Sequence, residues 1–134
     1  MSDASVLVVF REQASGHRAL AAAAGLGVPL TVVALAPREE RVRCGVQTGA
    51  LDDAICDAAL RELSSARALL GRRPLADRFV VVRTRGDGDL ARWARTAGLR
   101  RALVGARRAV LGVRARDGVA RALAQAGLDV NVIA

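Results

Sequence analysis

The sequence has few aromatic residues, and it contains neither tyrosine nor lysine. Its only aromatic residues are Phe10, Phe79 and Trp93, although hydrophobic residues make up 52% of the 134 positions. We therefore expect a core built from aliphatic side chains. This apolar content excludes an intrinsically disordered chain. The length fits one domain, which we place at residues 1–134.

Long hydrophobic runs are also missing. No apolar run approaches the roughly 18 residues that a membrane-spanning helix needs, and the apolar stretch at residues 6–10 is too short for a secretory signal. The two cysteines, Cys44 and Cys56, form no CxxC pair and are too few for a disulfide framework. We expect a cytoplasmic protein with reduced thiols and no membrane partner.

Side chains suited to catalysis are scarce. His17 is the one histidine of the sequence, and Ser15, two positions away, would not face it on a helix. No cluster of histidine, cysteine and carboxylate residues has the spacing of a metal site. The segment at residues 86–89, Gly-Asp-Gly-Asp, lacks the rest of a calcium-binding loop and its closing glutamate. We expect neither an enzyme nor a bound metal.

The charge is strongly positive, and every cationic side chain is arginine. There are 21 arginines and 13 acidic residues, which gives a net charge of +8. Such a balance raises the question of nucleic acid. However, the arginines are scattered along the chain, no aromatic platform accompanies them, and an excess of Ala, Arg, Gly and Val is typical of codon bias in a GC-rich genome. We expect no specific nucleic-acid partner.

Short apolar runs alternate with helical patterns along the chain. The runs predict strands at residues 6–10, 29–35, 79–83, 102–105 and 130–133, with a helix in each interval. This alternation predicts a parallel sheet with helices on both faces. Ser15, Thr48 and either Asp87 or Asp89 are the predicted helix caps. The longest predicted helix carries an apolar stripe formed by Leu51, Ile55, Ala59, Leu63, Ala66 and Leu70.

The stretch at residues 105–118 connects the fourth predicted strand to the last predicted helix. It leaves the strand at Gly105 and enters the helix at Gly118. Backbone N–H groups at such a turn can bind a phosphate. Two isolated glycines are a weak signal by themselves, because many strand-to-helix turns need one.

This arrangement resembles the universal stress protein family, and the match runs from Val6 to Ala134. Residues 6–20 are similar to the family's first strand, Asp-Gly-Ser turn and first helix. Residues 103–133 are similar to its glycine-containing loop, last helix and final strand. The resemblance implies a three-layer α/β/α sandwich of the adenine-nucleotide alpha-hydrolase-like type, with four helices and a five-stranded parallel sheet in the order 3-2-1-4-5.

ATP-binding members of that family carry a glycine, two residues, a second glycine, nine residues, and a third glycine followed by serine or threonine. Gly105 and Gly118 take the first and third glycine positions here. Arg108 stands at the second, where the backbone approaches phosphate closely. Val119 stands at the hydroxyl position, and Arg11 replaces an acidic residue after the first strand. These departures argue against ATP, which remains an alternative ligand, and we expect no cofactor.

Two functions remain open at this point, besides nucleic-acid binding through net charge alone, for which the sequence has no recognition helix, aromatic platform or basic run. The first is a non-enzymatic regulatory or interaction module with a degenerate nucleotide site, acting as a homodimer. The resemblance implies pairing through the last strand, where Val130, Val132 and Ile133 form an apolar edge. The second is an arginine-lined pocket that binds an anionic or nucleotide-like small molecule. The candidate pocket residues are Phe10, Arg11, Gly105, Arg107, Arg108, Gly118 and Val119.

Overall fold

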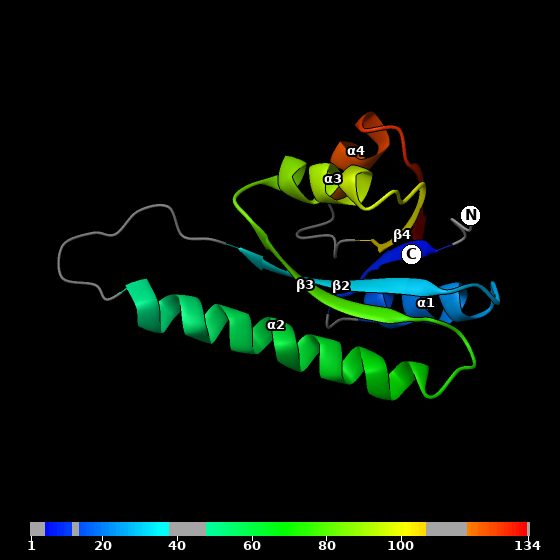
Figure 1. The fold of residues 1–134 in the computed structure, drawn as a ribbon, viewed down its shortest axis with the longest axis horizontal. Coiled ribbons are helices and arrows are strands. Elements are labelled where there is room, and N and C mark those ends of the chain that lie inside the picture. Colours follow the sequence, from blue (N-terminus) through cyan, green and yellow to red (C-terminus); the bar gives the residue numbers. More distant parts are fainter. Residues whose placement is uncertain (1–4, 12–13, 38–47, 107–117, 134) are drawn as a thin grey trace.

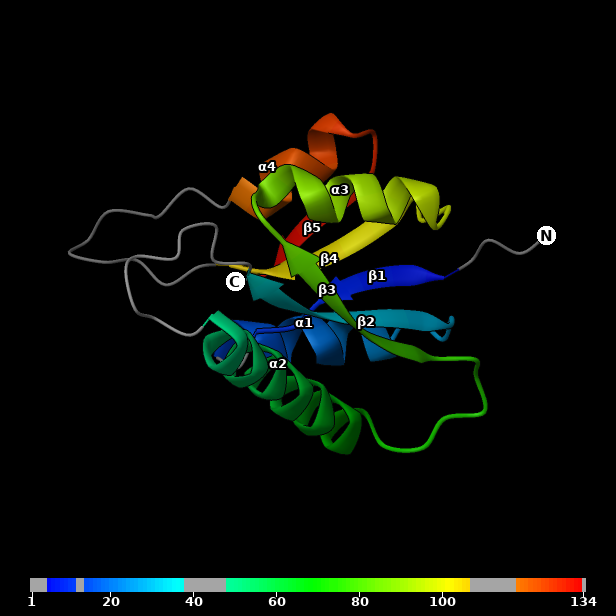
Figure 2. The same ribbon diagram turned by 60° about the vertical axis from the view of Figure 1, so that its left-hand side comes forward.

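The computed structural model of the chain describes residues 5–11, 14–37, 48–106 and 118–133. Five strands form one parallel sheet, and helices α1 and α2 cover one of its faces while α3 and α4 cover the other (Figures 1 and 2). The elements follow one another as β1 (Val6–Val9), α1 (Ala14–Ala24), β2 (Leu30–Pro37), α2 (Thr48–Leu70), β3 (Arg78–Thr84), α3 (Asp87–Thr96), β4 (Arg101–Gly105), α4 (Gly118–Gln125) and β5 (Asp129–Ile133).

The strand order is β3-β2-β1-β4-β5, and every pair of neighbours is parallel. This confirms the architecture that the sequence resemblance implied. β1 lies at the centre, with Val8 opposite Val32 of β2 and opposite Leu103 of β4. The strand order therefore reverses between β1 and β4, and in open α/β sheets ligands bind beyond the carboxyl ends of the strands at such a switch point.

Apolar side chains form a separate cluster on each face of the sheet. The alternation along β1 sends Val6, Val8 and Phe10 to the α1/α2 face, and it sends Leu7 and Val9 to the α3/α4 face. All five are at most 2% exposed. A strand covered on both faces reads as a continuous apolar run, which is why this segment was predicted correctly.

Helix α2 follows the predicted apolar stripe. Ala59, Leu63 and Ala66 are buried against the sheet, and Ile55 and Leu70 pack partly against the same cluster. The helix ends before Gly71, whose φ of 71° lies in the left-handed region that favours glycine. The side chain of Leu51 is outside the described residues.

Two of the three predicted helix caps are wrong, and the side chain of the third, Thr48, lies outside the described residues. Ser15 lies within α1, which begins at Ala14, and its hydroxyl donates to the carbonyl oxygen of Ala106 instead of capping the helix. Helix α3 has Gly86 at its N-cap position, without a side-chain hydrogen bond. Asp89 instead accepts a hydrogen bond of 2.6 Å from the backbone N–H of Arg85. Ser15 does not act as a cap because its hydroxyl reaches the Ala106 carbonyl oxygen, an acceptor that only the tertiary structure brings close.

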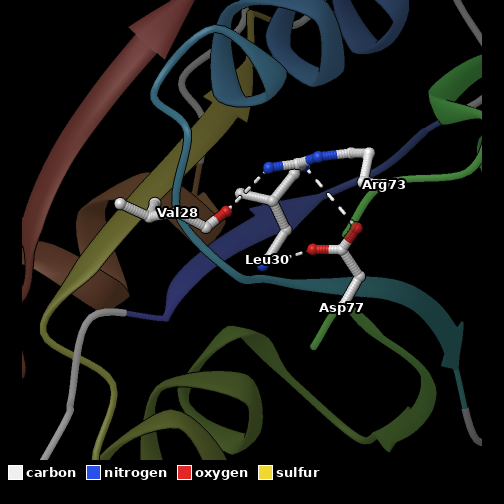
Figure 3. A network of polar contacts seen from close by, with 4 residues as sticks. All are labelled: Val28, Leu30, Arg73 and Asp77. Atoms are coloured by element: carbon white, nitrogen blue, oxygen red, sulfur yellow. Dashed lines mark hydrogen bonds and ion pairs between the residues drawn. The ribbon is translucent and has the colours of Figure 1, made fainter. Parts of the chain in front are cut away.

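A buried polar network fixes the start of β2 at the opposite end of the sheet from the switch point (Figure 3). The backbone N–H of Leu30 donates to the Asp77 carboxylate over 2.9 Å, and the Arg73 guanidinium donates to the carbonyl oxygen of Val28 over 2.9 Å. Arg73 and Asp77 form an ion pair at 3.6 Å, with side chains only 11% and 10% exposed. The network therefore ties the segment between α2 and β3 to the beginning of β2.

Candidate functional site

The candidate site lies beyond the carboxyl ends of β1 and β4. Val9 and Val104 are register partners near the ends of these strands. Phe10 and then Arg11 follow β1, and Ala106 follows β4. Helices α1 and α4 also begin at this edge, because each runs back across the sheet to reach the next strand (Figure 2). The sheet topology thus brings Arg11, Gly105 and Gly118 to the same end of the molecule.

Gly105 is in direct contact with the first turn of α1. A Cβ atom at Gly105 would lie 2.8 Å from the backbone nitrogen of Gly16 and 2.8 Å from the carbonyl oxygen of Ser15. A Cβ at Gly16 would in turn collide with the carbonyl oxygen of Arg11. Both glycines are therefore needed for helix α1 to pack this closely against β1 and β4. Gly105 has a packing role here whether or not a phosphate binds.

The backbone of Ala106 is bonded on both sides. Its N–H donates to the carbonyl oxygen of Ile133 over 2.7 Å, and its carbonyl oxygen accepts from the Ser15 hydroxyl over 2.6 Å. The N–H group that leaves β4 at the switch point is therefore already used inside the protein. A phosphate at this turn would have to compete with the hydrogen bond to β5.

Phe10 is part of the core. Its side chain is 1% exposed and packs in the cluster between the sheet and helices α1 and α2. Its ring also stacks on the exposed His17 ring, with centroids 5.7 Å apart and an angle of 11° between the planes. Phe10 was predicted as a pocket residue, but these contacts place its ring in the core and below His17.

Val119 is buried on the other side of the sheet. It is 4% exposed and belongs to the same apolar cluster as Leu90 and Leu123, between the sheet and helices α3 and α4. The position that carries a phosphate-binding hydroxyl in ATP-binding relatives therefore holds a core side chain in this protein. Arg11 is half-buried at the end of β1. The predicted pocket residues Arg107 and Arg108 lie outside the described residues.

The described side chains provide little catalytic chemistry. No group of three or more histidine, cysteine or acidic residues within the described ranges could hold a metal ion. The Ser15 hydroxyl is directed to the Ala106 carbonyl, so it does not form a nucleophile–base pair with His17. Within the same ranges, no helix is long and apolar enough to cross a membrane.

Cys56 has a polar partner that the sequence did not indicate. The Arg83 guanidinium donates to its sulfur over 2.9 Å, joining α2 to the end of β3. The thiol is half-buried and packs partly against the α1/α2 cluster, which agrees with the packing role predicted for it. Cys44 lies outside the described residues.

Strand β5 is the edge strand next to β4, and it has no other neighbour among the described strands. Val132 is 52% exposed. Val130 packs partly on the α3/α4 cluster and Ile133 on the α1/α2 cluster. The three residues predicted as one apolar edge therefore point to two faces, and of the three only Val132 is exposed.

Solved structures of universal stress proteins superpose on nearly the whole chain. A protein of that family from Burkholderia pseudomallei is 23% identical, with a TM-score of 0.76 over 97% of this chain and 95% of that one. UspA from Lactobacillus plantarum is 12% identical, with a TM-score of 0.80 over 100% and 99%. A universal stress protein in complex with cAMP is 19% identical, with a TM-score of 0.59 over 97% and 96%.

The chain therefore has the universal stress protein fold, as the resemblance of its sequence predicted. No protein-family model matches the sequence. No curated protein matches it either.

Proposed function

We propose that this protein is a non-enzymatic regulatory or interaction module of the universal stress protein type. It acts in the cytoplasm as a homodimer, and its switch-point site does not bind ATP. The observation that carries the proposal is the packed junction between the first turn of α1 and the end of β4. There, Gly105 contacts Ser15 and Gly16, and both polar groups of the Ala106 backbone are already bonded.

Three features near the carboxyl ends of β1 and β4 oppose a triphosphate. The Ala106 N–H is donated to β5, so it is not available to a phosphate oxygen. Val119 has no hydroxyl and lies in the core. Arg11 has the opposite charge to the acidic residue that ATP-binding relatives carry after the first strand. An arginine side chain can attract phosphates, but it does not replace backbone N–H groups that approach a phosphate closely.

Isothermal titration calorimetry with Mg-ATP tests this proposal directly. We expect a dissociation constant no tighter than about 1 mM, which corresponds to about −4 kcal/mol. Titration of magnesium chloride alone provides the matched blank. The same samples are expected to release no phosphate from ATP above a protein-free blank. A low-micromolar dissociation constant for ATP would contradict the proposal.

The dimer part of the proposal is supported by the edge strand. The outer edge of β5 has no described strand beside it, and Val132 on this strand is 52% exposed. An unpaired strand edge with an apolar side chain is a template for pairing with another chain. A second copy of the chain, presenting the same strand, is the partner that would both pair with the outer edge of β5 and cover Val132.

A second candidate function is the binding of a small anionic molecule at the switch point. Arg11 is half-buried beside the first turn of α1, and one protein of the same fold has been solved in complex with cAMP. A thermal-shift titration with cAMP, with inorganic phosphate as the comparison, tests this candidate. Saturation at 100 times the dissociation constant would stabilise the protein by about 2.7 kcal/mol. An Arg11→Gln variant is expected to lose that stabilisation.

A further inference from the structure

The positive charge of the chain is concentrated in its second half. Residues 85–125 contain ten arginines and three aspartates, whereas residues 48–70 contain two arginines and four acidic residues. Of these residues, only Arg92, Arg95 and Arg121 and the two aspartates Asp87 and Asp89 belong to helices α3 and α4, whereas the second stretch is helix α2. These helices cover opposite faces of the sheet (Figure 1). Helices α3 and α4 together therefore carry a net charge of +1, and helix α2 carries −2.

The described arginines of α3 and α4 face outward. On α3, the buried residues Leu90 and Ala94 face the sheet, and Arg92 and Arg95 are exposed on the opposite side. On α4, Leu123 is buried and Arg121 is exposed. Because α3 and α4 pack against each other on one face of the sheet, all three arginines lie on the outer surface of a single layer. We call Arg92, Arg95 and Arg121 the cationic face.

The cationic face is weakly neutralised by its surroundings. Arg92 pairs with Asp89 at 3.7 Å, but its side chain is 79% exposed. Exposed ion pairs of this kind contribute little and yield to a stronger partner. No carboxylate in the described part of the chain forms an ion pair with Arg95 or Arg121. At least two guanidinium groups on this face are therefore available to an anionic partner.

We propose that the cationic face binds the phosphate backbone of duplex DNA without sequence preference. Arginine donates hydrogen bonds in a fork that matches two phosphate oxygens. Phosphate contacts need only charge and donors on the protein side, and they carry no sequence information. Such a contact also agrees with the absence of a basic run or recognition motif in the sequence.

The chemistry of the surface favours a duplex over other anionic partners. The large hydrophobic side chains exposed in the described part of the chain are Leu26, Leu60, Leu69 and Val132, none of which is on α3 or α4. A stable complex with an acidic protein would draw on an apolar interface core, and binding to an anionic membrane is strengthened by apolar side chains that enter the lipid.

Nucleic acids other than duplex DNA fit this surface less well. Single strands bind through stacking on aromatic residues, and Trp93 on α3 packs partly in the core. Duplex RNA is recognised partly through its 2′-hydroxyls. Duplex DNA is therefore the partner to test.

Fluorescence anisotropy with a labelled DNA duplex of random sequence, repeated from about 50 to about 200 mM salt, measures the interaction. The test variant is the triple Arg92→Gln, Arg95→Gln, Arg121→Gln. If three phosphate contacts are lost, the slope of log K against log salt falls in magnitude by about 2.7, and binding at 0.1 M salt weakens on the order of 100-fold. A triple in which the same positions become lysine is expected to keep most of the slope, because lysine retains the point charge.

The control triple Arg18→Gln, Arg61→Gln, Arg72→Gln removes the same net charge from exposed positions on α1, on α2 and in the α2–β3 segment. It is expected to change the affinity less than about threefold, since these arginines lie outside the cationic face. Circular dichroism verifies that all variants are folded. Equal loss in both glutamine triples would overturn the proposal in favour of net charge alone. No duplex binding at the lowest salt, or tighter binding to phosphatidylserine vesicles than to DNA, would overturn it as well.

Discussion

The hydroxyl of Ser15 donates a hydrogen bond of 2.6 Å to the carbonyl oxygen of Ala106, 91 positions further along the chain. The bond joins the first turn of α1 to the residue that follows β4. It lies beside Gly105, whose missing side chain lets the two elements touch. In this protein, α1 and the end of β4 are therefore hydrogen-bonded and closely packed at the edge of the sheet where proteins of this fold would be expected to bind ligands.

Replacing Gly105 by alanine is expected to lower the free energy of unfolding by about 1–3 kcal/mol. The new Cβ would lie 2.8 Å from backbone atoms of Ser15 and Gly16, which move only if the whole helix shifts. Urea denaturation measures the change. Gly88→Ala is the matched control. A Cβ at Gly88 meets nothing within 4 Å, and alanine in a helix is neutral or up to about 1 kcal/mol stabilising. If the Gly105→Ala and Gly88→Ala variants are equally stable, Gly105 is not in tight contact with Ser15 and Gly16.

Replacing Asp77 by alanine is expected to destabilise the protein by about 3 kcal/mol. The substitution leaves the Leu30 N–H without its acceptor and leaves the nearly buried Arg73 guanidinium without its counter-charge (Figure 3). The midpoint of urea unfolding reports the loss. Asp53→Ala, at an exposed position on α2, is expected to stay within about 0.5 kcal/mol of the natural protein. A similarly small effect at Asp77 would mean that the network adds no stability.

A Val132→Asp substitution is expected to convert the dimer to a monomer. If the β5 strands of two copies pair, the added carboxylate would lose its hydration and would be repelled by the same carboxylate of the other copy. Light scattering at tens of micromolar protein measures the mass. Asn131→Asp adds the same charge to the neighbouring exposed position of β5, on the other face of the strand, and is expected to weaken the dimer less. A monomer mass for the natural protein would refute the proposed dimer.

The triple Arg11→Asp, Arg108→Gly, Val119→Ser is expected to bind Mg-ATP at least about tenfold more tightly than the natural protein, a gain of about 1.4 kcal/mol. It restores the three residue types that ATP-binding relatives carry at these positions. Calorimetry measures the affinity. No gain in a folded triple would mean that other features, such as the bonded Ala106 backbone, prevent binding.

The single variant Val119→Ser controls for stability in that experiment. Val119 is 4% exposed among apolar side chains, so a serine there is expected to cost about 1–2 kcal/mol of unfolding free energy. The double variant Arg11→Asp, Arg108→Gly keeps Val119 and avoids this loss of stability. It therefore shows how much affinity for ATP the other two substitutions add. A Val119→Ser protein as stable as the natural one would contradict the burial of this side chain.

The candidate site was only partly predictable from the sequence. The strand order, which gathers Arg11, Gly105 and Gly118 at one edge, is confirmed. Phe10 was assigned to the pocket, but it continues the alternation of Val6 and Val8 and belongs to the core. Val119 lies four residues before Leu123, and this helical spacing was the available signal that both face the sheet.

The sequence by itself determined the alternation of strands and helices, because apolar periodicity is a local property, and the strand order came from its resemblance to a known family. Only the tertiary structure decided how the switch point is packed and hydrogen-bonded. The contact of Gly105 with Ser15 and Gly16, and the hydrogen bonds of Ala106 to α1 and β5, join segments that are distant along the chain. Their existence depends on how closely α1 and β5 approach β4 in space. That approach is set by the packing of the whole sheet, which no local pattern encodes.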